Sequence, residues 1–267
     1  MTSFVTAGVV VEIAPDVSGT GDSLPTEVID SYRRNGFVQL RGVLRPDEVA
    51  RFAAAAMNAY EYSQALNADD QTFKQVVNVW QDDEVLRGLT LHPVLAGLAT
   101  QLAGIPLRLW HDHLLMKKPH NRAATEFHQD APYWPHDNCR HCLSVWVALV
   151  DVPLERGCMT FIPGQQDRRD IRPIDLTDHT DMFEAADDLI YQPRVTIPLR
   201  AGDVTFHNGY TPHSANPNDT DEVRLAHVVI YVDRDLTYNG AAHVCTDPLA
   251  LTVGDPLPDE SFPPLPC

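Results

Sequence analysis

The distribution of apolar and polar positions along the chain changes once, near residue 105. Before it, residues 23–36, 45–66 and 92–104 each have a Pro near the start, which the first two runs follow with acidic residues, as helix beginnings do. The runs 23–36 and 92–104 close on Gly36 and Gly104. Residues 37–44 alternate like a short strand between the first two. The pattern therefore predicts a mostly helical region over residues 23–104.

From residue 105 the chain consists of short runs rich in β-branched and aromatic residues, bounded by Gly, Pro, Asn or Asp. These runs are PLRLWHDHLLMKKP, SVWVALVDVPL, CMTFIPG, RVTIPL, GDVTFHNG and RLAHVVIYVD. Many short strands at fairly even spacing are typical of an antiparallel sandwich, barrel or jelly roll. We predict a mainly β fold with flanking helices, in which the acidic, aperiodic residues 172–193 form a long loop or lid with a turn of helix.

The same pattern predicts one domain over residues 23–250, with helical support over 23–104 and a β core over 105–235. Residues 1–22 and the Pro-rich residues 251–267 are predicted to be loosely ordered tails. No apolar run approaches the roughly 20 residues that span a bilayer, and the N-terminus lacks the basic region of a signal peptide. We expect a soluble, cytoplasmic protein that enters no membrane.

The net charge and the cysteine content exclude some classes of binding partner and of cross-link. The formal net charge of −17 repels phosphate backbones, so nucleic acid is an unsuitable partner, and it disfavours a polyanionic acyl-CoA substrate. Five Cys in 267 residues do not indicate a disulfide framework. The CRHC stretch at 139–142 has zinc-like spacing, but no second pair follows it, so no structural metal is expected there.

Two His-x-acid pairs stand out as candidate chemistry, although 12 His and 37 acidic residues in 267 give about two by chance. His128 and Asp130 end a strand-like run, which places both side chains on one side. His179 and Asp181 lie in the acidic loop, where nothing would hold them rigidly. Non-haem iron oxygenases bind Fe(II) with two His and one carboxylate, so His128 and Asp130 need a further His downstream.

The downstream candidates for a third ligand are His207 and His213, in GDVTFHNGYTPHSANPN. Arg224 follows His213 by eleven residues, at the start of the last strand-like run. A guanidinium there could pair with both oxygens of a carboxylate, as an organic-acid cosubstrate would require.

FHQDAPYWP, SVWVALVDVPLERGCMTFIPG and the segment from His207 to Arg224 together resemble the phytanoyl-CoA dioxygenase family, from about residue 28 to 235. The resemblance implies a double-stranded β-helix of jelly-roll, cupin-like form that uses Fe(II), 2-oxoglutarate and O2. The eleven-residue step to Arg224 matches the family and favours His213 over His207. The resemblance implies iron ligands His128, Asp130 and His213, and 2-oxoglutarate contacts from Arg224, Lys117 and Trp146.

The chain departs from the family pattern at two places. Relatives usually have PGSH in the turn where this chain has PGQQ, so Gln165 and Gln166 depart from the pattern. Ala215 stands where most relatives have a small hydroxyl residue. Thr211 or Ser214 could supply that hydroxyl to the cosubstrate instead.

Several residues near these motifs have both a structural and a substrate-binding interpretation. Tyr133 and Trp134 either wall a substrate pocket or pack the turn after the HQD motif. His111 and His113 share one face of a strand and could line the cavity, although a structural role is the simpler one. A structural role is also expected for four other histidines: His136, His141, His227 and His243.

The predicted function is hydroxylation of an unactivated C–H bond of a small metabolite or natural-product intermediate, with release of succinate and CO2. Related halogenases lack the carboxylate ligand, so Asp130 favours hydroxylation, or desaturation, epoxidation or ring formation, over halogenation. Two alternatives remain open: a cupin-like isomerase or hydrolase with a metal but no 2-oxoglutarate, and a non-catalytic β-sandwich binding protein. The predicted partner is a small-molecule substrate, bound by a monomer or homodimer.

Overall fold

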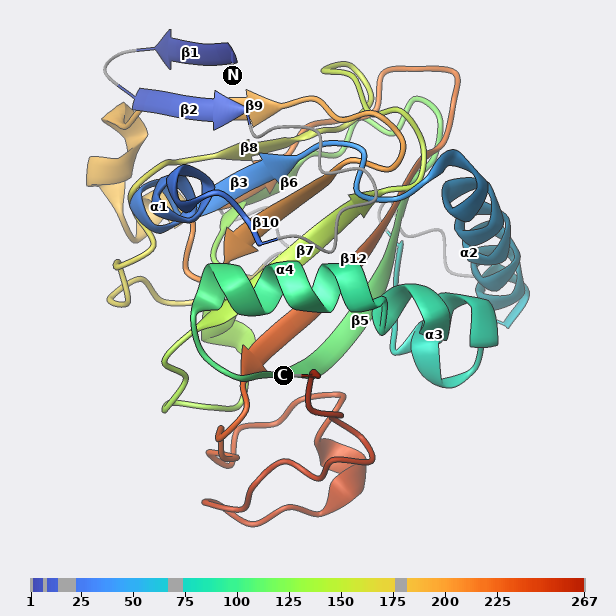
Figure 1. Cartoon of the computed structure of the whole chain (residues 1–267), viewed down its shortest axis with the longest axis vertical. Helices are drawn as coiled ribbons and strands as arrows, with labels where there is room; N and C mark the ends of the chain where they lie inside the picture. Colours follow the sequence, from blue (N-terminus) through green and yellow to red (C-terminus); the bar gives the residue numbers. More distant parts are fainter. Residues whose placement is uncertain (1, 7–8, 14–22, 67–73, 176–181, 267) are drawn as a thin grey trace.

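Two antiparallel sheets and a set of flanking helices make up the computed structural model, which describes residues 2–6, 9–13, 23–66, 74–175 and 182–266 (Figure 1). The helices are α1 (Thr26–Asn35), α2 (Pro46–Leu66), α3 (Glu84–Thr90) and α4 (Pro93–Ala103). The strands of the large sheet, in spatial order, are β3 (Phe37–Leu40), β10 (Val204–Asn208), β7 (Cys142–Ala148), β12 (Arg224–Asp233), β5 (Leu107–Lys117) and β4 (Lys74–Val77). Those of the small sheet are β6 (Thr125–His128), β11 (His213–Ala215), β8 (Met159–Phe161) and β9 (Val195–Ile197).

From β5 to β12 the chain crosses between the two sheets repeatedly. β5, β7, β10 and β12 belong to the large sheet, while β6, β8, β9 and β11, which alternate with them along the chain, belong to the small one. Such crossing is the connectivity of a jelly roll. The predicted mainly β fold with a jelly-roll core behind a helical region is therefore confirmed.

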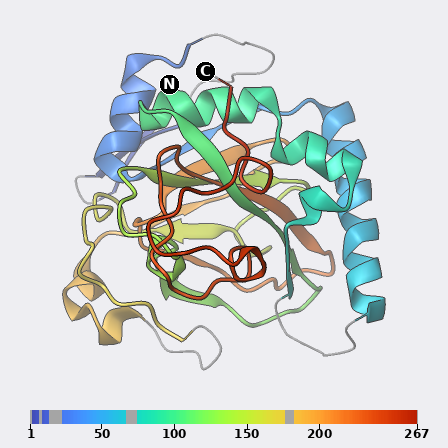
Figure 2. The same ribbon diagram turned by 90° about the horizontal axis from the view of Figure 1, so that it is seen from below.

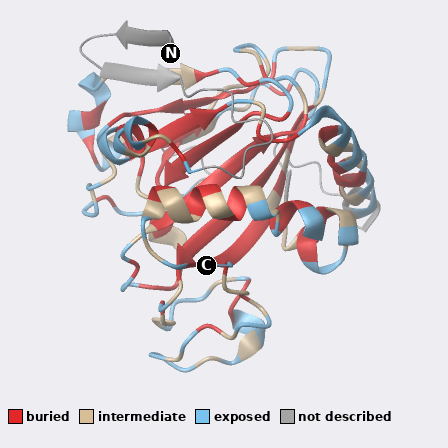
Figure 3. Cartoon of the chain, viewed as in Figure 1, coloured by how far each residue is buried: buried red, intermediate tan, exposed pale blue. Residues whose placement is uncertain are grey.

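The large sheet is buried on both faces, which explains why its strands read as nearly continuous apolar runs (Figure 3). In β7, Val145 packs in the core beneath the helices, whereas the next residue, Trp146, packs between the sheets. In β12, Val229 and Ile230 divide in the same way. Alternate residues of each strand thus point into two different cores, one between the large sheet and the helices and one between the two sheets.

Local signals account for the helix ends. Gly36 and Gly104 end α1 and α4 with φ of 81° and 69°, a left-handed conformation that glycine adopts without strain. Sequence reasoning missed α3, although Asp83 caps it by accepting hydrogen bonds from the N–H groups of Val85 and Leu86 at 2.8 and 2.9 Å. None of the helices in the described ranges is long and apolar enough to cross a membrane.

The predicted tail at the N-terminus contains regular structure that was not expected, whereas the predicted loop at 172–193 has the expected turn of helix. β1 (Thr2–Thr6) and β2 (Val9–Ile13) form an antiparallel pair, and the remaining residues of 1–22 lie outside the described ranges. In the loop, 3-10 turns at Met182–Glu184 and Asp187–Tyr191 supply the predicted helical turn. Residues 176–181, which include His179 and Asp181, also lie outside the described part.

The C-terminal segment is not a loose tail, which corrects the prediction for residues 251–267. Seen from below, it lies across the end of the sheets (Figure 2). The N–H of Leu265 donates to the carbonyl of Leu107 at 2.9 Å, and Leu109 donates to the carbonyl of Pro263 at 2.9 Å, so the segment pairs with β5. Phe262 is 1% exposed and stacks on Trp110 with ring centroids 4.9 Å apart.

Removal of the Phe262 ring should therefore destabilise the whole domain. We expect Phe262→Ala to lower the free energy of unfolding by about 3–5 kcal/mol, the usual cost of emptying a buried aromatic site. Urea denaturation followed by fluorescence measures this. Val253→Ala, in the same segment but 68% exposed, should change it by less than about 0.5 kcal/mol. Equal effects of the two substitutions would contradict the packing described.

Candidate metal and cosubstrate site

A cavity of about 250 Å³ lies between the two sheets. Strands β5, β7, β10 and β12 of the large sheet and β6, β8 and β11 of the small sheet all contribute to its wall. Most of the wall is apolar, with residues such as Leu115, Met159 and Ile230. Polar groups interrupt it in several places, of which the first lies at the paired ends of β6 and β11.

His128, Asp130 and His213 lie together at that place. His213, the first residue of β11, pairs directly with His128, the last residue of β6. Asp130 follows two residues later, where the chain enters the 3-10 turn Ala131–Tyr133. One potential ligand atom from each side chain lies within 4.8 Å of the other two. The structure therefore brings the three predicted ligands together although 85 residues separate His128 from His213.

Both imidazoles are held with Nε2 toward the cavity. Nδ1 of His128 lies 2.7 Å from the carbonyl oxygen of Glu126, and Nδ1 of His213 lies 3.0 Å from that of Thr211. A carbonyl can only accept, so each Nδ1 carries a proton and Nε2 is the nitrogen left for an ion. Metal-binding histidines are usually oriented in this way.

The two oxygens of Asp130 have different neighbours. Oδ1 faces the imidazoles, 3.5 Å from Nε2 of His128 and 3.7 Å from Nε2 of His213. Oδ2 accepts a hydrogen bond from the Ser144 hydroxyl at 3.0 Å and lies 3.3 Å from Nε2 of His207. Ser144 and His207 therefore orient the carboxylate so that Oδ1 is the oxygen left for an ion.

The charges at this cluster suit a cation. Burial lowers the pKa of His213 to about 3, so this imidazole is neutral and can act as a ligand. Burial alone would raise the pKa of Asp130, but the His213, His128 and His207 imidazoles hold it well below its ordinary value. Two imidazole nitrogens and one carboxylate oxygen are the donors of a facial Fe(II) site, so the residues present fit that ion.

Arg224, at the start of β12 in the large sheet, carries the second polar group of interest in the cavity. Its side chain is 1% exposed, and its Nε and Nη1 have no hydrogen-bond partner among the described residues. Burial lowers its pKa to about 10, which still leaves it charged at neutral pH. The guanidinium carbon lies 5.6 Å from the centroid of the Trp146 ring. A buried, unpaired cation beside a metal site fits an anionic ligand.

A family model for phytanoyl-CoA dioxygenase (PhyH) matches residues 32–226 of the chain. The chain belongs to the phytanoyl-CoA dioxygenase family. The predicted family resemblance is thereby confirmed.

Two curated relatives show how far the similarity extends along the chain. Phytanoyl-CoA dioxygenase domain-containing protein 1 of Mus musculus is 29% identical over 152 residues, which cover 55% of this chain and 52% of that protein. The chain thus spans about half the length of this relative. A methylphosphonate hydroxylase of Gimesia maris is 26% identical over 236 residues, 82% of each chain.

Among solved structures, the non-heme α-ketoglutarate-dependent carbocyclase SnoK from nogalamycin biosynthesis is 38% identical, with a TM-score of 0.84. The match covers 93% of this chain and 99% of SnoK. The α-ketoglutarate-dependent epimerase SnoN from nogalamycin biosynthesis is 36% identical with a TM-score of 0.74, over 91% of this chain and 96% of SnoN.

Lys117 does not occupy the position that the family resemblance implied. It points inward, as predicted, and is fully buried. However, its Nζ donates to the carbonyl oxygens of Ala123, Ala215 and Asn216 at 3.0, 3.2 and 2.8 Å. All three donor positions of the ammonium are therefore engaged by backbone. Lys117 thus joins the backbone at the end of β11 to the loop before β6. This corrects the prediction that it contacts 2-oxoglutarate.

The two proposed substitutes for the missing hydroxyl are also turned away from the cavity. The Thr211 hydroxyl donates to the carbonyl of Gly36 at 2.8 Å, and Ser214 alternates with the cavity-lining His213 and Ala215. A hydroxyl does reach the wall at Thr125, which pairs with Ala215 across β6 and β11. Sequence reasoning missed Thr125, because only the register of the two strands places it opposite position 215.

Tyr133 and Trp134 combine the two roles between which the sequence could not choose. Both line the cavity. The Tyr133 hydroxyl also donates to the carbonyl of Ile174 at 2.7 Å and accepts from its N–H at 3.0 Å, which fixes the start of the long loop. Trp134 packs against Gly209, where an added Cβ would lie 3.0 Å from the indole.

His111 and His113 both line the cavity, as the period-2 pattern allowed. Their rings stack with centroids 4.3 Å apart. The pairing of β5 with β12 shifts by one residue beside Trp110, so Trp110 and His111 both face inward. Gln165 and Gln166 lie outside the cavity, and Gln166 instead donates to the carbonyl of Arg33 at 2.8 Å.

The different contacts of His207 and His213 predict different losses of metal affinity. His213→Ala should abolish tight Fe(II) binding, because it removes a ligand. His207→Ala should weaken binding by about 10–100-fold, since this residue only orients Asp130. Anaerobic calorimetric titration with Fe(II) measures both, and His120→Ala, on the surface, is the control. A larger loss in His207→Ala would make His207 the third ligand instead.

Proposed function

We propose that this chain is an Fe(II)- and 2-oxoglutarate-dependent oxygenase that oxidises a C–H bond of a small natural-product intermediate. The observation that carries the proposal is the presence, in one cavity, of the His128–Asp130–His213 cluster and of the Arg224 guanidinium, which has no partner among the described residues. A cupin-like metalloenzyme without 2-oxoglutarate would have no use for a buried cation there. A binding protein would need neither group.

The protein's own residues would hold and orient the reactants. Fe(II) and 2-oxoglutarate, when bound, supply the oxidation of a C–H bond by O2 with release of succinate and CO2. His128, Asp130 and His213 would hold the ion. Arg224 would pair with the distal carboxylate of 2-oxoglutarate, with Trp146 packed beside it and Thr125 lining the same cavity from β6.

The remaining wall would position the substrate and exclude water. Tyr133 and Trp134 cover the metal cluster from the turn after β6, and His111 and His113 face it from β5. Burial lowers the pKa of His113 to about 4, so this imidazole is neutral and can hydrogen-bond an uncharged substrate. The apolar wall and these neutral donors favour an uncharged, partly oxygenated substrate over an acyl-CoA.

The similarity to SnoK and SnoN supports a substrate from natural-product biosynthesis. SnoN has been solved with Fe3+, α-ketoglutarate and nogalamycin RO, and the chain is 34% identical to it over 90% of its own length. Hydroxylation is the simplest outcome of oxidising a C–H bond. Ring closure is the second candidate, because the carbocyclase matches over nearly its full length at 38% identity.

The Arg224 assignment predicts a selective loss of 2-oxoglutarate binding. Fe(II) added anaerobically with 2-oxoglutarate should give a weak visible charge-transfer band in the wild-type protein. Arg224→Met should raise the apparent Kd for 2-oxoglutarate by roughly 100-fold, because a charge-assisted pair is lost, and leave Fe(II) binding within about threefold. Arg169→Met, on an exposed arginine, should change neither. A band in Arg224→Met at wild-type 2-oxoglutarate concentrations would refute the assignment.

The product of the reaction identifies the type of oxidation. The purified enzyme, with Fe(II), 2-oxoglutarate and a panel of uncharged polycyclic natural-product intermediates, should release succinate with at least one of them. Mass spectrometry then separates hydroxylation, which adds one oxygen atom, from ring closure, which removes two hydrogen atoms. Asp130→Ala should form neither succinate nor product above background. Full activity in that variant would rule out the metal site.

A further inference from the structure

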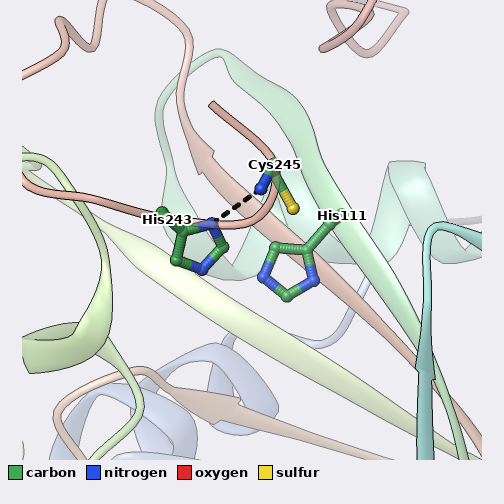
Figure 4. Close-up of side chains that lie close together, drawn as sticks. All are labelled: His111, His243 and Cys245. Atoms are coloured by element: carbon green, nitrogen blue, oxygen red, sulfur yellow. Dashed lines mark hydrogen bonds between the residues drawn. The ribbon is translucent and has the colours of Figure 1, made fainter. Parts of the chain in front are cut away.

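A second group of potential metal ligands lies on the cavity wall and shares no residue with the Fe(II) cluster. It consists of His111 from β5 and of His243 and Cys245 from residues 234–266, which follow β12 and include the C-terminal segment (Figure 4). One potential ligand atom from each lies within 4.8 Å of the other two. A structural role was predicted for His243, but the structure places it beside His111 with ring centroids 5.5 Å apart.

The ring nitrogens of His111 are unsatisfied, which indicates that this group can bind a further ligand. Its side chain is 2% exposed, yet neither Nδ1 nor Nε2 has a hydrogen-bond partner among the described residues. Buried imidazole nitrogens that make no well-formed hydrogen bond are costly, since they have lost water. Burial also lowers its pKa well below the ordinary value, so the ring is neutral and has a lone pair to donate.

His243 and Cys245 form a preorganised pair on one tight turn. The N–H groups of Thr246 and Asp247 both donate to the carbonyl of His243 at 2.9 Å, which closes the turn. The N–H of Cys245 lies 3.2 Å from Nδ1 of His243, so this nitrogen carries its lone pair on the side of the cysteine (Figure 4). An ion would compete only with that one long hydrogen bond.

The Cys245 thiol has the surroundings of a metal thiolate. It is 7% exposed, and the side-chain amide of Asn78 donates to Sγ at 3.5 Å. Hydrogen bonds of this kind support the charge of a coordinated sulfur. Without an ion, burial raises the pKa of the thiol to about 12, so the thiolate forms only when a cation replaces its proton.

We propose that His111, His243 and Cys245 form a second metal site, selective for a borderline ion such as Zn²⁺. The donor set of two nitrogens and one sulfur favours Zn²⁺, whereas two nitrogens and one oxygen suit Fe(II) at the first cluster. Ligand atoms of a tetrahedral zinc site lie roughly 3.3–3.8 Å apart, so closure from the present spacing needs shifts of about 1 Å. The fourth position would face the cavity, and the thiol proton would pass to solvent.

Such an ion would join the C-terminal segment to β5. Residues 234–266 contact the sheet through Phe262, Leu265 and the Arg108 guanidinium, and the second site adds a link at residues 243–245. Because His111 and His243 both line the cavity, the ion would also fix one wall of the substrate pocket. This role does not depend on the oxidation chemistry of the first cluster.

Cobalt(II) is the probe that tests the second site, since cobalt bound to a thiolate absorbs in the near ultraviolet. Metal-free protein titrated anaerobically with Co²⁺ should bind two ions per chain and develop this band. Cys245→Ser should lose the band and one ion. Cys158→Ser, at another buried cysteine outside the group, should keep both, and His128→Ala should keep the band while losing the ion of the first cluster.

Thermal unfolding gives an independent measurement. Zn²⁺ at about 100 times its Kd should raise the Tm of His128→Ala by on the order of 5 °C, and should not raise that of the double variant His128→Ala, Cys245→Ser. His243→Ala in place of Cys245→Ser should behave in the same way. A thiolate band that survives Cys245→Ser, or a single bound ion that is lost in His128→Ala, would overturn the second site and leave the proposed function untouched.

Discussion

The pairing of two short strands, β6 and β11, is the contact on which the site depends. It sets His128 opposite His213, and a slip of one residue would turn one imidazole out of the cavity. Three or four residues cannot hold such a register alone, so neighbouring segments fix it. Gly36 accepts hydrogen bonds from Asn208 and Thr211, and an added Cβ there would lie 2.4 Å from the Thr211 hydroxyl. The end of α1 thus constrains the loop that carries a metal ligand.

Two buried cations show how the fold distinguishes support from binding. Lys117 and Arg224 are cross-strand partners on β5 and β12, and both are almost fully buried. The ammonium of Lys117 is satisfied by three carbonyl oxygens, whereas two nitrogens of Arg224 have no hydrogen-bond partner in the part of the chain that the structure describes. An unpaired buried charge costs several kcal/mol, which a bound carboxylate would offset. A bound anionic ligand would therefore account for the cost of burying the Arg224 guanidinium.

Sequence patterns predicted the elements and the ligand cluster because both depend on short-range or motif-level signals. Gly36 and Gly104 marked helix ends, and the His128–Asp130 pair stood at a strand end. Contacts made across long separations were not predictable: the carbonyls that engage Lys117 lie up to 99 residues away. The Pro-rich segment looked unstructured because it has no period, yet Phe262 and Leu265 bury it through irregular backbone. Thr125 was not predicted either, because only the register between β6 and β11 places it opposite Ala215.

A ligand cluster of fixed geometry does not by itself decide what is made. The carbocyclase and the epimerase from nogalamycin biosynthesis are both α-ketoglutarate-dependent and both match this chain over nearly its whole length, so the same scaffold supports different outcomes. The outcome must then follow from how the substrate lies against the metal. Here that wall is built from the turn at Tyr133 and Trp134, the bulged part of β5 and the C-terminal turn at His243. The bulged part of β5 and the turn at His243 lie outside the β6–β11 pairing, so the part of the wall that they form can vary while His128 and His213 stay paired.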